Sequence, residues 1–306
     1  MSDQAAGPEA LSLVRTVGGI LCGLAATSCY NLGPALQKEG LNTLPPLTER
    51  SLLEQLKLLG SSRRWLAGFL IGIFGAIPYT AAVGLAGVTV VQPLMGFGLA
   101  VLVWYGWKRL GERIGAAAAV GIALMVVLPV LITFSRVSGS TRSLVSTQGR
   151  VLLLASFGVL AAGGILLALA ARALSILYAP LAGAILALLP VCMNGAIDLI
   201  RDMRRLGGAD TGGVLWVVLL GVLGLGSNIV GYYVMQIGLQ RTPATRFNPV
   251  MIGVTVMVGA ALGVVVFGQR IGRVPLYAAA LAGVLAGLVL LAVRRRDAPG
   301  ADRAPG

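Results

Sequence analysis

Polar residues recur every four positions inside long apolar runs of this sequence, where their side chains would share one face of a helix. The repeated sets are Asn228, Tyr232 and Gln236; Asn194 and Asp198; and Thr27 and Asn31. A polar side chain inside a membrane span is costly, so such residues either line a solute pathway or hold neighbouring helices together. Both interpretations stay open for the Asn228 set, and helix contact is favoured for Thr27.

Two prolines directly follow an amide residue, in Gln92-Pro93 and Asn248-Pro249. A proline inside a helix leaves the carbonyl four residues earlier without its amide partner. In a membrane, protein, water or substrate must satisfy that carbonyl, whereas a proline in the first helical turn removes no bond. The predicted substrate-binding residues are Asn31, Gln92, Pro93, Asn194, Asn228, Tyr232, Gln236, Asn248 and Pro249.

Asp198 is the carboxylate that we expect inside or at the edge of a span, where it would be a coupling group for a proton or cation. The alternative, which is favoured, is an interfacial ion pair with Arg201 or Arg205. Glu112 lies beside Arg113 at the end of an apolar run, which favours interfacial ion pairs. The sequence has no histidine, which excludes imidazole catalysis and His metal sites. We therefore expect no catalytic residue, no metal site and no cofactor.

The elements that would position these residues are membrane helices. Of 306 residues, 57% are hydrophobic and 11% charged, and the mean hydropathy is +0.89, whereas soluble domains carry about 25% charged residues. Runs of about 20 apolar residues can cross a bilayer, and they predict an all-α integral membrane protein with a bundle of about nine transmembrane helices. The expected spans are 11–34, 65–86, 88–107, 114–135, 151–171, 174–199, 213–239, 245–267 and 274–293.

The formal charge of +13 reflects 24 Lys and Arg residues that lie almost entirely in connections and tails. Membrane proteins concentrate such residues on the cytoplasmic side, so topology explains the charge and nucleic-acid binding is not expected. Over the expected spans, roughly 15 positive residues share a side with the C-terminal tail and roughly 9 lie opposite. This bias predicts a multi-pass protein of the plasma (inner) membrane with a cytoplasmic C-terminus.

Two distant stretches are similar. "VTVVQPLMGFGLAVLVWYGWKRLGERIG" (88–115) and "RFNPVMIGVTVMVGAALGVVVFGQRIG" (246–272) align through their prolines, and their RIG ends match with an offset of one residue. The two copies lie an odd number of spans apart, which is typical of the inverted-topology repeats of secondary transporters. The predicted organisation is a first repeat half at 1–135 with an interfacial segment at 37–64, a flexible linker at 136–150, an extra span at 151–171, a second half at 172–293 and a disordered tail at 294–306.

The sequence "GVTVVQPLMGFGLAVLVWYGWKRLGERIG" resembles the drug/metabolite transporter superfamily (EamA-like), in which a helix opens near a proline and closes with an "ER" pair. "TSCYNLGPALQKEGL" and "RRWLAGFLIGIFGAIPYTAAVGLAGVTVVQPLM" are similar to the first three helices of its nine-span NIPA-like branch. The resemblance covers residues 20–125 and 213–272. It implies the fold more directly than it implies a substrate.

The favoured function is that of a secondary transporter, a drug/metabolite-type permease that moves a small solute by alternating access. The alternative, implied by the NIPA-like resemblance, is a magnesium transporter, although Mg²⁺ sites usually include one or two carboxylates and few are expected inside the spans. An enzyme is not expected, since no nucleophile–base pair is recognisable. The expected partners are a small-molecule or ion substrate and the lipid bilayer, and a homodimer stays open.

Overall fold

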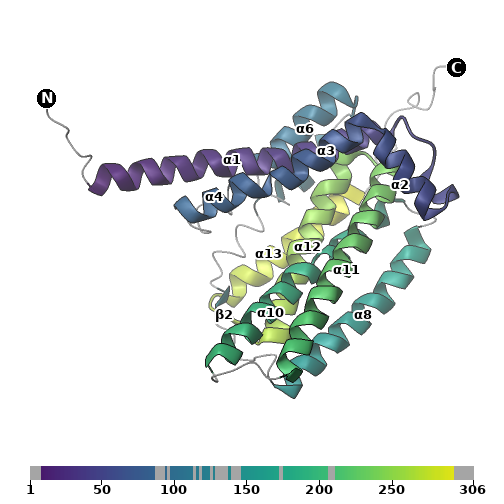
Figure 1. Ribbon diagram of the computed structural model, residues 1–306. Helices are drawn as coiled ribbons and strands as arrows, with labels where there is room; N and C mark the ends of the chain where they lie inside the picture. Colours follow the sequence, from purple (N-terminus) through teal and green to yellow (C-terminus); the bar gives the residue numbers. More distant parts are fainter. Residues whose placement is uncertain are drawn as a thin grey trace, which may run out of the picture.

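The computed structural model describes residues 8–86, 94, 97–112, 115–116, 119–124, 127, 137–138, 146–171, 175–205 and 211–292. Helices dominate this part of the chain (Figure 1). The α-helices are α1 (Pro8–Leu41), α2 (Leu52–Ser61), α3 (Arg63–Phe74), α4 (Ala76–Ala86), α6 (Phe97–Arg109), α8 (Thr147–Ala171), α9 (Tyr178–Leu186), α10 (Leu188–Arg205), α11 (Thr211–Arg241), α12 (Ala244–Phe267) and α13 (Val274–Ala292). Two short 3-10 helices, η1 (Leu47–Glu49) and η2 (Ser175–Leu177), precede α2 and α9.

Five helical stretches among the described residues are long and apolar enough to cross a membrane, which supports an all-α membrane protein. They are Arg63–Ala82, Thr147–Leu166, Ser175–Arg205, Thr211–Arg241 and Ala244–Phe267. Large apolar side chains are exposed along their outer faces, including Val159 at 72% and Val222 at 64%, as expected for helices that contact lipid. The expected span at 114–135 lies largely outside the described residues, so the number of nine spans stays a prediction.

Two of the expected spans are each divided by a proline. α3 ends at Phe74 and α9 ends at Leu186, and each of these residues lies four positions before a proline, Pro78 or Pro190. Because proline has no amide hydrogen, the carbonyl four residues earlier loses its helical partner. One residue therefore separates the two helices of each span, and the second helix begins at Ala76 or at Leu188.

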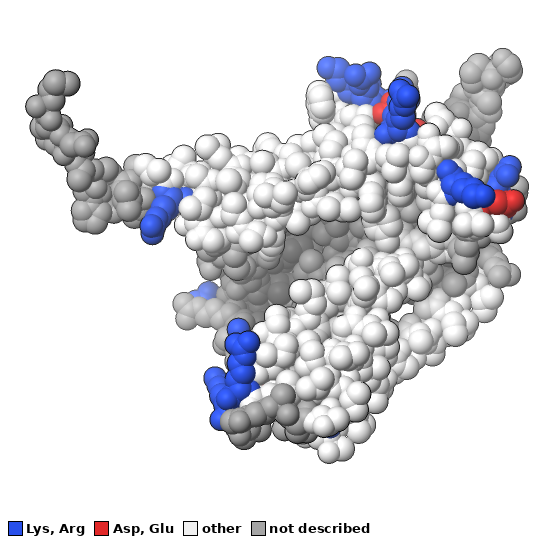
Figure 2. All heavy atoms as spheres, in the orientation of Figure 1, with Lys and Arg blue, Asp and Glu red and all other residues white. Residues whose placement is uncertain are grey.

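The helices form two groups that meet at one end and diverge toward the other (Figure 1). In the first group, α1 packs on α3, α4 and α6; in the second, α9 packs on α8, α11 and α12, while α10 packs on α11 and α13 on α12. Contacts of α1 with α11 and α12, and of α6 with α12, join the groups. A hollow separates them away from this junction (Figure 2).

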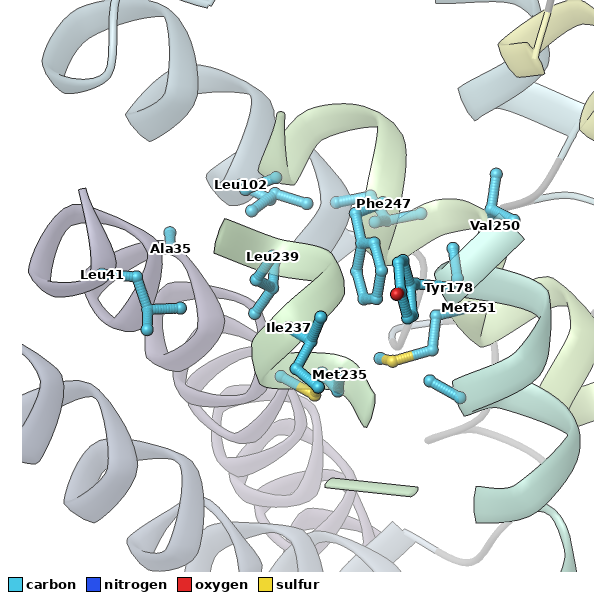
Figure 3. Close-up of a cluster of buried hydrophobic side chains, with 14 of the residues drawn as sticks. Ala35, Leu41, Leu102, Tyr178, Met235, Ile237, Leu239, Phe247, Val250 and Met251 are labelled. Atoms are coloured by element: carbon cyan, nitrogen blue, oxygen red, sulfur yellow. The ribbon is translucent and has the colours of Figure 1, made fainter. Parts of the chain in front are cut away.

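A hydrophobic core fills the junction. Leu41 of α1 and Leu102 of α6 lie in one buried cluster with Tyr178 of α9, Leu239 of α11 and Phe247 of α12 (Figure 3). Between membrane helices, close packing of such side chains stabilises the contact through van der Waals interactions. The junction is thus a packed contact between residues that are far apart in the sequence.

Two connections contain short elements of secondary structure. Within the predicted flexible linker 136–150, the short strand β1 (Val137–Ser138) pairs antiparallel with β2 (Arg270–Ile271), and α8 already begins at Thr147. The expected interfacial segment 37–64 overlaps the last turn of α1 and contains the short helix α2. A capping box opens α2, since Ser51 and Glu54 each bond the other's backbone amide, and these bonds lower the pKa of Glu54.

Candidate functional site

A series of hydrogen bonds between buried side chains joins α1 and α3 to α11. Trp65 Nε1 donates to Gln236 Oε1 at 2.9 Å, and Gln236 Nε2 donates to Gln37 Oε1 at 3.0 Å. Gln37 Nε2 then donates to the Tyr232 hydroxyl at 2.6 Å. Because Gln37 and Gln236 are each only 2% exposed, unmade hydrogen bonds would be costly here. We call Trp65, Gln236, Gln37 and Tyr232 the amide network.

Aromatic rings cover the amide network. The Trp65 ring stacks on Phe69 at 5.3 Å between centroids, and Phe69 meets the Tyr232 ring edge-on at 5.9 Å. The helical spacing correctly placed Tyr232 and Gln236 on one face, since both contact Gln37. Asn228 is half-buried and joins none of these bonds in the described part of the chain. The network resembles helix–helix contact more than a set of free ligand-binding groups.

Three buried amide oxygens are different, because they have no hydrogen-bond partner among the described residues. They are Asn31 Oδ1 on α1, Gln55 Oε1 on α2 and Asn248 Oδ1 on α12, in side chains that are 4%, 5% and 1% exposed. Of these, Asn31 and Asn248 belong to the long helices of the two packed groups. Asn31 Nδ2 donates to the Thr27 carbonyl at 3.0 Å, and Thr27 Oγ1 accepts from the amide of Gly98 on α6. A buried acceptor without a partner costs about 1–3 kcal/mol. The oxygens of Asn31 and Asn248 are therefore candidate acceptors for a bound ligand.

Pro249 follows Asn248 inside α12 and is buried. It is the sixth residue of the helix, so the interpretation as a first-turn proline is wrong for this position. Its missing amide hydrogen leaves the Thr245 carbonyl without the usual helical donor. Of the other predicted residues, Asn194 is exposed on α10, and Gln92 and Pro93 lie outside the described residues.

Asp198 lies on α10 and forms an ion pair with Arg201 at 3.7 Å, one turn later. The Asp198 side chain is 32% exposed and that of Arg201 67% exposed. This geometry agrees with the favoured interpretation of an interfacial pair. Exposed pairs of this kind contribute about 0–1 kcal/mol to stability.

As a test of the coupling role expected for Asp198, we expect Asp198→Asn to leave flux in liposomes within about two-fold of the unchanged protein, because the carboxylate is partly exposed and already paired with Arg201. The initial rate of flux measures this. Asp202→Asn, on the same helix, serves as a control for loss of charge. A ten-fold loss specific to Asp198→Asn would show that this carboxylate takes part in coupling.

Glu112 makes contacts that the sequence did not predict. Its Oε1 accepts from the amide of Ala244 at 2.8 Å. Its Oε2 accepts from the amide of Thr245 at 2.9 Å and from Thr245 Oγ1 at 2.6 Å. Since these are the first residues of α12, Glu112 satisfies helix N-terminal amides that have no partner within the helix. Arg113 lies outside the described residues.

The first helix group also holds the end of α11. Lys38 is 8% exposed, and its Nζ donates to the Gln240 carbonyl at 3.1 Å. The Gln240 side chain accepts from the Leu47 amide and donates to the carbonyls of Leu44 and Pro45. The sequence pattern did not single out Gln37, Lys38, Trp65 or Gln240. The available signal for the first two was the polar stretch "QKEG" after the first apolar run.

Comparison with known proteins supports a transport function. Over 101 residues the chain is 40% identical to "Probable magnesium transporter NIPA9" from Arabidopsis thaliana, in a match that covers 33% of this chain and 29% of that protein. The chain matches no family model and no solved structure. The similarity is to a transporter and not to an enzyme, in agreement with the expectation from the sequence. Over a third of its length, this membrane protein is therefore similar to a NIPA-like transporter.

Proposed function

We propose that the protein is a secondary transporter that carries Mg²⁺ across the membrane by alternating access between its two helix groups. The observation that carries the proposal is that the buried amide oxygens of Asn31 and Asn248 have no hydrogen-bond partner within the described part of the chain. One belongs to α1 of the first group and the other to α12 of the second. Mg²⁺ is a hard cation that prefers oxygen ligands and usually keeps several waters. The partial similarity to a probable magnesium transporter favours this cargo.

The arrangement of the helices also supports the proposal. α6 contacts both α1 and α12, with Gly98 against Asn31 and Gly106 against Thr245. The two groups meet at one end and leave a hollow toward the other (Figure 2). The same kind of turn follows α6 and α12, since the glycine shortly after each helix has a left-handed φ. The value is 66° for Gly111 and 61° for Gly268. We infer that the two halves are inverted repeats, which in transporters surround a central site.

A small polar solute is the second candidate cargo. Among the described residues, no group of three or more His, Cys, Asp or Glu side chains could hold a metal ion. Amide groups that donate and accept hydrogen bonds suit an uncharged solute at least as well as they suit a cation. This candidate corresponds to the drug/metabolite-type permease that the sequence favours.

Substitution of Asn248 distinguishes the two cargoes. We expect Asn248→Ala to lower flux about ten-fold for either cargo, because one buried acceptor is worth about 1–3 kcal/mol. Asn248→Asp replaces the amide by a carboxylate, which is a stronger Mg²⁺ ligand. It should restore Mg²⁺ flux or lower its KM, and it should not restore flux of a neutral solute.

The measurement is flux into liposomes that contain the reconstituted protein, with an Mg²⁺ indicator or a radiolabelled solute panel. Asn42→Ala is the matched control, since it removes an exposed asparagine that is not among the predicted binding residues. Absence of protein-dependent flux for Mg²⁺ and for every solute would contradict the transport proposal. Unchanged Mg²⁺ flux in Asn248→Ala would remove this residue from the pathway.

A further inference from the structure

Two opposite charges of the first helix group hold one turn of the second group. The turn joins α11, which ends at Arg241, to α12, which begins at Ala244. Lys38 Nζ binds the Gln240 carbonyl in the last turn of α11, and the Glu112 carboxylate binds the first amides of α12. A cation at a helix C-terminus and an anion at a helix N-terminus both complement the helix dipole. The contacts are therefore favourable at both ends of the turn.

α12 depends on Glu112 for its cap. Its own N-cap residue, Pro243, makes no side-chain capping bond. The N-terminal amides of a helix need acceptors from outside it, and charge-assisted bonds are about twice as strong as neutral ones. A residue far away in the sequence thus performs the task that Ser, Thr, Asp or Asn usually performs locally.

The backbone after α6 positions the Glu112 carboxylate. Gly111 has a left-handed φ of 66°, and the Glu112 amide donates to the Gly106 carbonyl at 2.9 Å. Gly106 has no side chain, which lets Thr245 pack directly against α6: a Cβ at this position would overlap Thr245 Cγ2 and lie 3.2 Å from Glu112 Oε2.

The same turn recurs after α12 with a neutral residue. Gly268 has a φ of 61°, and the Gln269 amide donates to the Gly263 carbonyl at 3.3 Å. Gly263, Gly268 and Gln269 have the same spacing as Gly106, Gly111 and Glu112. The turn itself therefore does not require a carboxylate. The negative charge of Glu112 instead serves its contact with α12.

We propose that Lys38 and Glu112 form a gate at the junction of the two helix groups. They hold the α11–α12 turn closed against α1 and α6, and transport requires these contacts to break and re-form. The inference rests on the alternating-access transport proposed above. Asn248 lies one helical turn after Thr245 on α12. Release of the α11–α12 turn would therefore expose Asn248 to solvent at the junction.

A reversible crosslink across the gate provides the first test. Gly106→Cys and Thr245→Cys would be combined after replacement of Cys22, Cys29 and Cys192 by Ser. The overlap of a Gly106 Cβ with Thr245 places the two positions within disulfide range. We expect oxidation to abolish Mg²⁺ flux in liposomes and dithiothreitol to restore it. Each single cysteine variant is measured with and without the oxidant, because both substitutions also change contacts of the turn; the oxidant itself should have no effect on either. Full flux through the crosslinked protein would overturn the gate while leaving the transport function intact.

Chemical labelling tests the gate independently of any cargo and of the crosslink. In the background without native cysteines, Asn248→Cys is buried and should react slowly with a membrane-impermeant maleimide, since Asn248 is 1% exposed. Addition of Glu112→Ala should raise the labelling rate about ten-fold, because charge-assisted bonds that hold the turn are lost. Glu54→Ala is the matched control, as it removes a helix-capping carboxylate on exposed α2. Equal labelling rates with and without Glu112 would overturn the proposal, whatever the flux assay shows.

Discussion

Gly98→Ala is expected to lower the free energy of unfolding by about 3–5 kcal/mol, since overpacking and broken buried hydrogen bonds combine. A Cβ at Gly98 would overlap the Asn31 amide nitrogen, Thr27 Oγ1 and the Thr27 carbonyl. The carbonyl belongs to the backbone of α1, so a side-chain rotation cannot relieve the contact. α1 and α6 would have to separate, which would break the bond from the Gly98 amide to Thr27 Oγ1.

Thermal unfolding in detergent micelles, followed by the monodisperse fraction that remains after heating, measures this loss. Gly226→Ala on α11 is the matched control, because a Cβ there would meet no described atom within 4 Å. Its stability should rise by up to about 1 kcal/mol, since alanine is the better helix former. A Gly98→Ala protein as stable as the control would contradict the close packing of α1 on α6.

Gln236→Leu should destabilise the protein by about 2–4 kcal/mol, because it leaves two buried polar groups without a partner. The side chain has similar volume, so packing changes little. The Trp65 indole N–H loses its acceptor and the Gln37 oxygen loses its donor. Both groups lie where water cannot replace the bond, as Gln37 is 2% and Trp65 8% exposed.

A double-mutant cycle with Trp65→Phe isolates this effect. Since phenylalanine has no N–H, the double variant leaves one fewer unpaired group and should cost less than the sum of the two single variants. Asn228→Leu, on the same helix but outside the amide network, should change the stability by less than about 1 kcal/mol. Additive costs in the cycle would show that the Trp65–Gln236 bond does not contribute to stability.

Helical periodicity predicted part of the amide network correctly. The four-residue spacing of Tyr232 and Gln236 put both on one face of α11 because the spacing follows from helix geometry alone. Their partners, Gln37 and Trp65, come from α1 and α3, and no local pattern links residues so far apart in the sequence. The assignment of these residues to substrate binding stays a prediction.

Glu112 shows how a local observation can miss a distant contact. The charged end of its apolar run was recognised from the sequence, and the ion pair expected there stays a prediction, since Arg113 lies outside the described residues. The structure places the carboxylate on the first amides of α12. Unsatisfied amides exist at every helix start, but which carboxylate reaches them depends on how α6 packs on α12.

The sequence by itself determined the apolar helices and the chemistry of the buried amides, because composition and chain length act locally. The breaks near Pro78 and Pro190 were not predicted. Pro34 and Pro249 lie inside unbroken helices, so the missing proline amide alone does not decide where a helix breaks. Only the tertiary structure decided which buried amides are satisfied. The oxygens of Gln37 and Gln236 accept hydrogen bonds across helices, while those of Asn31 and Asn248 have no partner among the described residues. These four side chains carry the same functional group, and they differ in their surroundings because hydrogen-bond partners are set by contacts between distant segments.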